Sequence, residues 1–438
     1  MSNLWILGEE ALRAKSFKHI IDEAMGVEIN ENDIEIKPVV TPDNKFSWIY
    51  KISGFDIPGV GSIRYEIVSG TENFIDYLVY KQDTRPTVTD TPILLVEDNK
   101  SRPSDAGNMH KQRQIKFYNA SLHYPNVPML YLNIVPDFKK SEGVSPAYLK
   151  STRVYNTLGV KVKLVDFSGE DRSPEWNPYT SLKEMVEDNP VKFRKGTTPT
   201  GLKLENNTLT ISTKLLKGKN DLADPGVGFV GGASLAARKL GFKGDINVIN
   251  HQKPTSWLSK PRKSKLAKAS EMLNISFDIG NAKMQMEYSG NAEDYWTRKT
   301  TGEKHATILQ DVMLRNQGYE VIYDNHAGTE RGWFVTPQGD HLAVKKDIGG
   351  IPDLVVINEK TKQILVIEGE MYENANKGVA QFTTFIGFDR ELREYYPDYD
   401  VKYHLTLNGG HDTKENVLLH LQENGTIVEN WSAKGYAI

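Results

Sequence analysis

Three carboxylates in residues 349–370 (GGIPDLVVINEKTKQILVIEGE) have the types and spacing that metal-dependent hydrolysis needs. Asp353 begins an apolar run that predicts a strand, and Glu368 and Glu370 stand at the polar end of the next apolar run. Side chains two positions apart in a strand share a face, so a hairpin can bring the three acids together. Clustered carboxylates repel one another unless a cation joins them, and oxygen ligands without His or Cys suit Mg²⁺. The alternative is two strands whose polar ends only reach solvent.

A second acidic cluster follows the same plan in residues 72–101. Asp76 lies on one apolar run, and Glu97 and Asp98 end the next. Lys100 is two residues beyond Asp98, so these two side chains share a face of the predicted strand. A carboxylate beside an ammonium group can hold a metal and orient or deprotonate a water molecule. The alternative is that Lys100 only neutralises Asp98 at a strand edge.

Both clusters resemble the PD-(D/E)XK nuclease superfamily, which includes the type II restriction endonucleases. The resemblance covers about residues 70–130 and 300–410, and its motif is short. The C-terminal copy has Pro352–Asp353 followed by Glu368-Gly369-Glu370, and the N-terminal copy has Asp76 followed by Glu97-Asp98-Asn99-Lys100. The resemblance implies Mg²⁺-dependent hydrolysis of phosphodiester bonds in double-stranded DNA. It implies Asp353 and Glu368 as metal ligands in one site, and Asp76 with Glu97 or Asp98 in the other.

Each copy departs from the family pattern. Glu370 stands where the family usually has lysine, so either this glutamate serves there, or Lys377 of the following helix approaches that place, or the site is inactive. The N-terminal copy lacks the proline before Asp76, and its register leaves Glu97 and Asp98 as alternative ligands. By family position, Glu303 and Gln381 are accessory residues. Two copies imply either two active sites in one chain or one catalytic copy beside a DNA-binding one.

A basic segment between residues 236 and 270 indicates a nucleic-acid partner. Its one acid is Asp245, and its nine basic residues are Arg238, Lys239, Lys243, Lys253, Lys260, Arg262, Lys263, Lys265 and Lys268. Lysine and arginine neutralise phosphates, and Asn, Gln and Arg can contact base edges. The alternative is a solvated basic helix face. Together with the two nuclease-like hairpins, the segment favours binding of double-stranded DNA.

Composition excludes several other classes. The 438 residues contain no cysteine, which removes disulfides, thiol nucleophiles and Cys-ligated metals, and the formal charge is −3. The sequence has no secretory-signal pattern and no apolar run long enough to span a membrane, so a cytoplasmic location is expected. The GxGxxG match that begins at Gly226 follows no apolar strand, so we expect a tight turn before a helix there. The Asn177-Pro178-Tyr179 match lacks the second proline of amino-methyltransferases.

The alternation of apolar runs and turns predicts an α/β protein with two restriction-endonuclease-like cores. Each core is expected to have a mixed central sheet flanked by helices, with a basic DNA-recognition region between them. The expected segments are 1–195, 196–300 and 301–438. The first should begin with a helix over 8–25, and the last should contain helices over 303–318 and 377–396. The chain is expected to act either as a homodimer or as a monomer with two sites.

Overall fold

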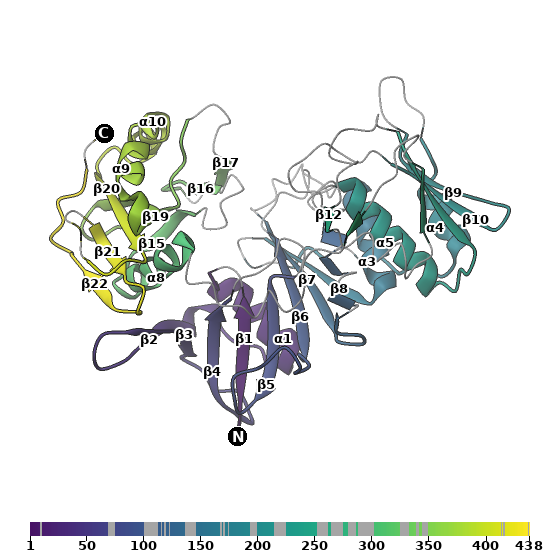
Figure 1. Cartoon of the computed structure of the whole chain (residues 1–438), viewed down its shortest axis with the longest axis horizontal. Coiled ribbons are helices and arrows are strands. Elements are labelled where there is room, and N and C mark those ends of the chain that lie inside the picture. The colour runs from purple at the N-terminus through teal and green to yellow at the C-terminus, as the bar shows by residue number, and fades with distance from the viewer. Residues whose placement is uncertain are drawn as a thin grey trace. The chain divides into compact units, whose positions relative to one another are not determined.

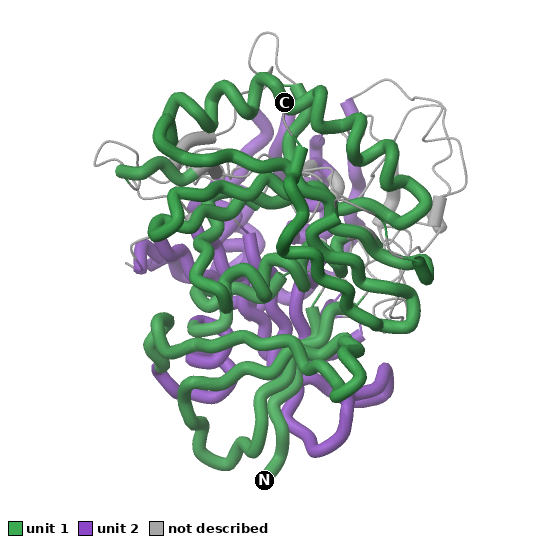
Figure 2. Tube along the Cα trace, turned by 90° about the vertical axis from the view of Figure 1, so that its left-hand side faces the viewer, with its two compact units in different colours: residues 1–18, 29–68, 298–438 green, residues 19–28, 69–297 purple. Residues whose placement is uncertain are grey.

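A computed structural model of the chain (Figure 1) contains two compact units, which Figure 2 shows in different colours. Unit 1 comprises residues 1–18, 29–68 and 298–438, and unit 2 comprises residues 19–28 and 69–297. The structure describes all residues except 9–10, 69–74, 100–112, 115, 118–119, 122, 136–145, 167–168, 170, 174, 193–198, 214–224, 252–261, 264–274, 279–285, 288–301, 325–332, 339–340, 344–348, 413, 415–416 and 437. The protein is of the mixed α/β class, as the sequence predicts.

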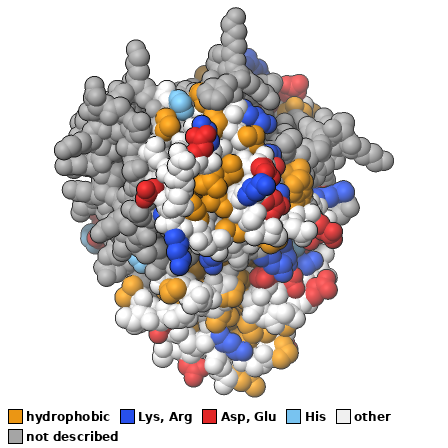
Figure 3. All heavy atoms as spheres, turned by 90° about the vertical axis from the view of Figure 1, so that its right-hand side faces the viewer, with side chains coloured by type: hydrophobic (Ala, Val, Ile, Leu, Met, Phe, Trp, Pro, Cys, Tyr) orange, Lys and Arg blue, Asp and Glu red, His pale blue; other side chains and the backbone are white. Residues whose placement is uncertain are grey.

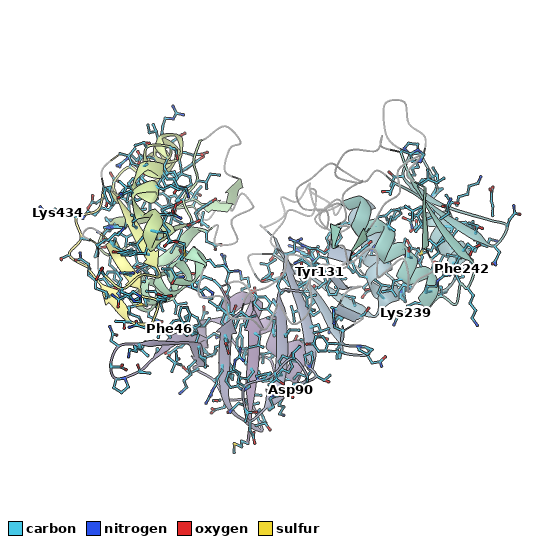
Figure 4. All side chains as sticks on the ribbon, viewed as in Figure 1. Phe46, Asp90, Tyr131, Lys239, Phe242 and Lys434 are labelled. Atoms are coloured by element: carbon cyan, nitrogen blue, oxygen red, sulfur yellow. The ribbon has the colours of Figure 1, made fainter. Side chains whose placement is uncertain are left out.

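The N-terminal part of unit 1 is a mixed set of four strands in the order β2-β3-β4-β1. Their bounds are β1 (Ser2–Gly8), β2 (Glu35–Val40), β3 (Phe46–Ser53) and β4 (Val60–Ile67), and a short 3-10 helix, η1 (Glu31–Asp33), precedes β2. β2, β3 and β4 form an antiparallel meander, and β1 runs parallel to β4. In β3, Tyr50 and Ile52 are buried while Lys51 between them is exposed, which is the alternation of a strand with one face in a core. Phe46, labelled in Figure 4, begins this strand and is also buried.

The C-terminal part of unit 1 is a six-stranded mixed sheet in the order β15-β18-β19-β20-β21-β22. Its strands are β15 (Glu320–Asp324), β18 (Leu354–Asn358), β19 (Gln363–Met371), β20 (Asp400–Asn408), β21 (Val417–Leu421) and β22 (Ile427–Glu429). β18 is antiparallel to both of its neighbours, β15 and β19, whereas β20 is parallel to β19. The crossover that this parallel pair requires carries two helices, α9 (Ala375–Phe382) and α10 (Ile386–Tyr395). A 3-10 helix, η2 (Tyr372–Asn374), precedes them, and a small ladder joins β16 (Trp333–Val335) to β17 (His341–Ala343).

Helix α8 (Glu303–Asn316) packs against β19 and β20 and also contacts β2 of the same unit. The amide of Asn316 donates to the Ile36 carbonyl (3.2 Å), and the ring of His305 meets Trp48 edge-on at 5.4 Å. Contacts on more than one side explain why polar residues of α8, such as Thr307 and Asp311, are buried along with its apolar ones.

Unit 2 has four neighbouring strands in the order β5-β6-β7-β8, with α3 between β7 and β8. Their bounds are β5 (Tyr77–Gln82), β6 (Leu94–Asn99), β7 (Met129–Val135), α3 (Pro146–Leu158) and β8 (Val160–Asp166). β5 and β6 form an antiparallel hairpin, and β7 and β8 follow in parallel. Tyr131 of β7 lies in an aromatic cluster with Phe117 and Tyr155, at centroid distances of 4.9 to 5.6 Å (Figure 4).

A second mixed sheet of unit 2 has the order β13-β11-β10-β9. The elements around it are α4 (Leu182–Asp188), β9 (Gly201–Glu205), β10 (Thr208–Thr213), α5 (Pro225–Lys239), β11 (Asp245–Asn250) and β13 (Ile275–Asp278). The predicted hairpin over residues 202–213 is confirmed as β9 and β10. Two residues of the basic segment, Arg262 and Lys263, form β12, which pairs with β14 (Met286–Glu287).

Three local predictions were wrong. Residues 2–8 form a strand, and the first helix, α1 (Ala14–Met25), begins only after it. The GxGxxG residues lie inside α5 instead of in a turn before it. The helix predicted over 377–396 is broken after Phe382, because Thr383 and Thr384 hydroxyls donate to carbonyls three residues back while the Thr384 carbonyl accepts from Gly350 N (2.9 Å). In the part of the chain that the structure describes, no helix is long and apolar enough to cross a membrane.

Buried His404 on β20 makes the stability of unit 1 depend on pH. Burial, with a smaller contribution from Lys402, lowers the pKa of His404 from 6.5 to about 4. Between these values the unfolded chain binds the proton and the folded chain does not, so the contribution of this histidine is complete above pH 6.5 and is lost as the pH falls toward 4. The change should amount to about 3 kcal/mol.

We therefore expect His404→Leu to reduce the loss of unfolding free energy between pH 6.5 and 4 by about this amount. Urea denaturation across this pH range measures the loss of unfolding free energy in each protein. At pH 8 the imidazole is neutral in both the folded and the unfolded state, so the difference in unfolding free energy between His404→Leu and wild type gives the packing cost of the substitution. An equal loss of stability in both proteins would show that His404 is not the titrating group.

Candidate active site

Two hairpins, one in each unit, place an aspartate beside a glutamate in the same register. Asp76 directly precedes β5, and the first pair of that hairpin is Tyr77 opposite Val96, so Asp76 lies next to Glu97. In the C-terminal hairpin Leu354 is opposite Ile367, so Asp353 lies next to Glu368. In both cases the second strand continues into a crossover and is followed by a parallel strand.

One backbone hydrogen bond fixes each aspartate against the neighbouring strand. The amide of Asp98 donates to Oδ2 of Asp76 (2.8 Å), and the amide of Gly369 donates to Oδ2 of Asp353 (2.9 Å). The donor in each case is the residue after the glutamate. The two hairpins therefore match residue for residue: Glu97 corresponds to Glu368, Asp98 to Gly369, and Asn99 to Glu370.

This correspondence bears on the register that the sequence left open. Successive side chains of a strand point to opposite faces, so Asp98 points away from the face that carries Glu97 and Asn99. The geometry thus favours Glu97 over Asp98 as the partner of Asp76. Lys100, the predicted lysine of this copy, lies outside the described residues.

Two basic residues from the segment after β6 contact the N-terminal pair. Nζ of Lys116 lies 2.9 Å from Oδ1 of Asp76 and 2.8 Å from Oε1 of Glu97, and Nε of Arg113 lies 2.9 Å from the same Glu97 oxygen. Glu97 is fully buried, and Asp76 and Lys116 are 3% and 6% exposed. The cluster is therefore an internal network of two acids and two bases.

Burial and charge act differently on the two acids. Burial opposes ionisation of Asp76, but the Lys116 and Arg113 cations and two hydrogen bonds hold its pKa below the usual value. Complete burial and the adjacent Asp76 charge raise the pKa of Glu97 well above its usual value, against the attraction of the same two cations. The balance of burial and charge therefore favours the ionised form of Asp76 and the protonated form of Glu97.

The C-terminal pair is more open. Asp353 is partly exposed, and the third acid, Glu370, receives Nζ of Lys377 at 3.0 Å on Oε1. The Lys377 side chain is 65% exposed, although Glu370 itself is only 2% exposed. Lys377, on the following helix, thus contacts Glu370, the glutamate that the sequence predicted it could approach.

Two buried acceptor oxygens lie where helix α9 packs against β19. Gly378 of α9 lies so close to Glu370 that an added Cβ would be 2.8 Å from the glutamate Cγ. Gln381 lies one turn further along the same helix. Oε2 of Glu370 and Oε1 of Gln381 are buried acceptors with no hydrogen-bond donor among the described residues. Both oxygens could therefore accept a ligand or a water molecule.

Gly369 allows helix α8 to approach the C-terminal pair. A Cβ at this position would lie 2.0 Å from Oγ1 of Thr307 and 3.1 Å from Oδ2 of Asp353. Glu303, predicted as an accessory residue from the resemblance, begins α8, but its side chain lies outside the described part of the chain. Across the described ranges, no group of three or more His, Cys, Asp or Glu side chains forms a metal-binding cluster. Glu368 and Glu370 lie on β19, and Asp353 directly precedes the adjoining strand β18.

The structure describes the basic segment only in part. Lys253, Lys260, Lys265 and Lys268 lie outside the described residues, as do the side chains of Arg262 and Lys263. Arg238 lies in the last turn of α5, where its guanidinium donates to the carbonyls of Phe242 and Gly244 (2.8 and 2.7 Å). Lys239, labelled in Figure 4, and Lys243 are exposed. On the face drawn in Figure 3, described basic side chains lie among acidic ones. Arg238 thus caps a helix end, while the exposed lysines are open to a partner.

Sequence reasoning missed Arg113 and Lys116. The signal was present in the sequence, because both residues follow the acidic strand and are three positions apart, which is the spacing of neighbours on one helix face. Lys377 stands in the comparable place of the other copy and was considered there. Each acidic hairpin is followed by a lysine, and a comparison of the two copies would have indicated Lys116 as the counterpart of Lys377.

Comparisons with protein-family models, with curated proteins and with solved structures found no match to this chain. A functional assignment therefore depends on the geometry of its own residues.

Lys116 should be essential to the stability of unit 2. Removing one partner of a buried ion pair leaves the other charge uncompensated, which costs about 3–5 kcal/mol. We expect Lys116→Met to lower the unfolding free energy by that amount in urea denaturation.

Lys163→Met is the matched control. Lys163 is also buried (9% exposed), but its partner Asp22 keeps 45% of its side chain exposed and can return to water. The control should lose about 1 kcal/mol or less. Similar losses in the two variants would contradict the buried network.

Proposed function

We propose that this chain is a Mg²⁺-dependent endonuclease that hydrolyses phosphodiester bonds of double-stranded DNA at specific sequences, as a type II restriction endonuclease does. The observation that supports this most directly is the repeated hairpin. Twice in one chain an aspartate lies beside a glutamate, and the aspartate carboxylate accepts a hydrogen bond from the backbone amide of the residue after that glutamate. The antiparallel hairpin and the parallel strand of both copies, with the helical crossover of the C-terminal copy, support this comparison with the core of the PD-(D/E)XK nucleases.

The donors of the C-terminal centre suit magnesium. Asp353, Glu368 and Glu370 offer only carboxylate oxygens, and Oε2 of Glu370 is a buried acceptor with no hydrogen-bond donor in the described part of the chain. Hard oxygen ligands of this kind are those that Mg²⁺ takes in proteins. Asp353 and Glu368 would hold the ion, which would stabilise charge on the attacked phosphate and lower the pKa of the attacking water.

The chain's own residues have separate tasks in this mechanism. The Gly369 amide keeps the Asp353 carboxylate turned toward the second strand. Glu370 would accept the proton of the attacking water, and Lys377 orients that carboxylate through its contact with Oε1. The exposed Lys239 and Lys243 would contribute to the attraction of the phosphate backbone, together with the remainder of the basic segment.

The test is a plasmid digest with Mg²⁺, on methylated and unmethylated DNA. Wild type should give discrete fragments, whereas Asp353→Asn and Glu368→Gln should each reduce the cleavage rate by at least about 100-fold, because each removes a ligand from the charge-stabilising centre. Asp398→Asn, at an exposed position after α10, is the control and should cleave like wild type.

The digest also separates the other functions. Cutting only at branched or damaged DNA would indicate a repair nuclease on the same fold. Binding of DNA that is indifferent to Mg²⁺, with no cleavage on either plasmid, would indicate a noncatalytic DNA-binding protein and contradict the proposal.

A further inference from the structure

We infer that Lys116 occupies the cation position of the N-terminal carboxylate pair, so that only the C-terminal pair of this chain takes a divalent metal ion. This inference rests on the proposed function, since it decides which of the two matching hairpins is the metal-dependent centre.

The position of the Lys116 ammonium supports the first half of the inference. Nζ lies between the two acids, within 2.8 to 3.0 Å of three of their oxygens: Oδ1 of Asp76 and both oxygens of Glu97. A metal ion held by this pair would need the same oxygens. The ammonium and the ion therefore compete for one place.

Charge and burial favour the ammonium of Lys116 over a divalent ion at this place. Asp76 and Glu97 already face two cations, Lys116 and Arg113, in a cluster that solvent hardly reaches. A divalent ion would add two positive charges there unless a buried ammonium were expelled. Moving charges into a buried place costs far more than it does at the surface. The N-terminal hairpin thus keeps the nuclease-like register with an internal cation in place of a metal.

The C-terminal centre differs at the corresponding lysine. The Lys377 side chain is 65% exposed, compared with 8% for Lys116. Lys377 reaches Oε1 of Glu370, the third acid, which corresponds to the uncharged Asn99 of the other hairpin. An exposed lysine can turn into water at little cost, so an incoming ion does not have to displace a buried charge.

The consequence concerns strand cutting. One metal centre in a chain cuts one strand in each bound orientation. A double-strand break would then require two copies of the chain, or two successive binding events, instead of the two sites of one monomer.

The experiment counts bound Mn²⁺, a spectroscopically visible substitute for Mg²⁺, on the full chain by electron paramagnetic resonance. Wild type should bind about one tight equivalent, Asp76→Asn should keep it, Asp353→Asn should lose it, and Lys116→Met should bind a second. Lys163→Met, which removes a buried lysine elsewhere in unit 2, should bind as wild type does.

A second variant covers the case in which Lys116→Met does not fold. The triple variant Asp76→Asn, Glu97→Gln, Lys116→Met removes the acids together with the cation, so it leaves only Arg113 of the network charged. Retention of the single equivalent in the triple variant would support the inference, and its loss would overturn it.

The remaining outcomes distinguish the two proposals. Two equivalents in wild type, or loss of the ion in Asp76→Asn, would overturn the inference and leave the nuclease proposal standing. No ion in wild type but one in Lys116→Met would support the role of Lys116 and contradict the C-terminal metal centre. No ion in any folded variant would overturn both.

Discussion

The candidate centres of this chain depend on one backbone interaction, in which an aspartate carboxylate accepts the amide that follows a glutamate on the neighbouring strand. Asp76 and Asp353 each precede a strand, where a short side chain could adopt several rotamers. The hydrogen bonds from Asp98 N and Gly369 N select the rotamer that turns the carboxylate toward the second strand. The register of the hairpin then determines which acid is its neighbour, because a shift by one residue would turn every side chain to the other face.

Both centres share this interaction, but they differ in how far their lysine side chain is removed from solvent. In unit 2 the crossover segment buries Lys116 against both acids, and its ammonium lies between their oxygens. In unit 1 the glycines at 369 and 378 let α8 and α9 come close to the acidic strand, while the side chain of Lys377 stays mostly exposed. The same register can thus serve either as an internal ion network or as an open acidic centre, and the position of one lysine determines which.

Much of the fold could be predicted because apolar runs and turn residues mark most strands directly. The acid hairpin of each unit, the hairpin of residues 202–213 and α8 all follow from such local signals. Failures occurred where tertiary contacts override local preference. The helix after β19 breaks because the Thr384 carbonyl is taken by Gly350, which is 34 residues away in the chain, and the glycines of 226–231 are helical within a packed unit.

The acids, their strands and the spacing that makes two similar hairpins can be read from the sequence, because these depend on local periodicity. Three features appear only in the folded chain: Glu97 and not Asp98 faces Asp76, Lys116 and Arg113 contact the N-terminal pair, and Lys377 reaches Glu370. They appear only there because strand register and helix approach are set by packing between segments far apart in sequence. Burial, and with it the cost of a charge, exists only once those segments have packed.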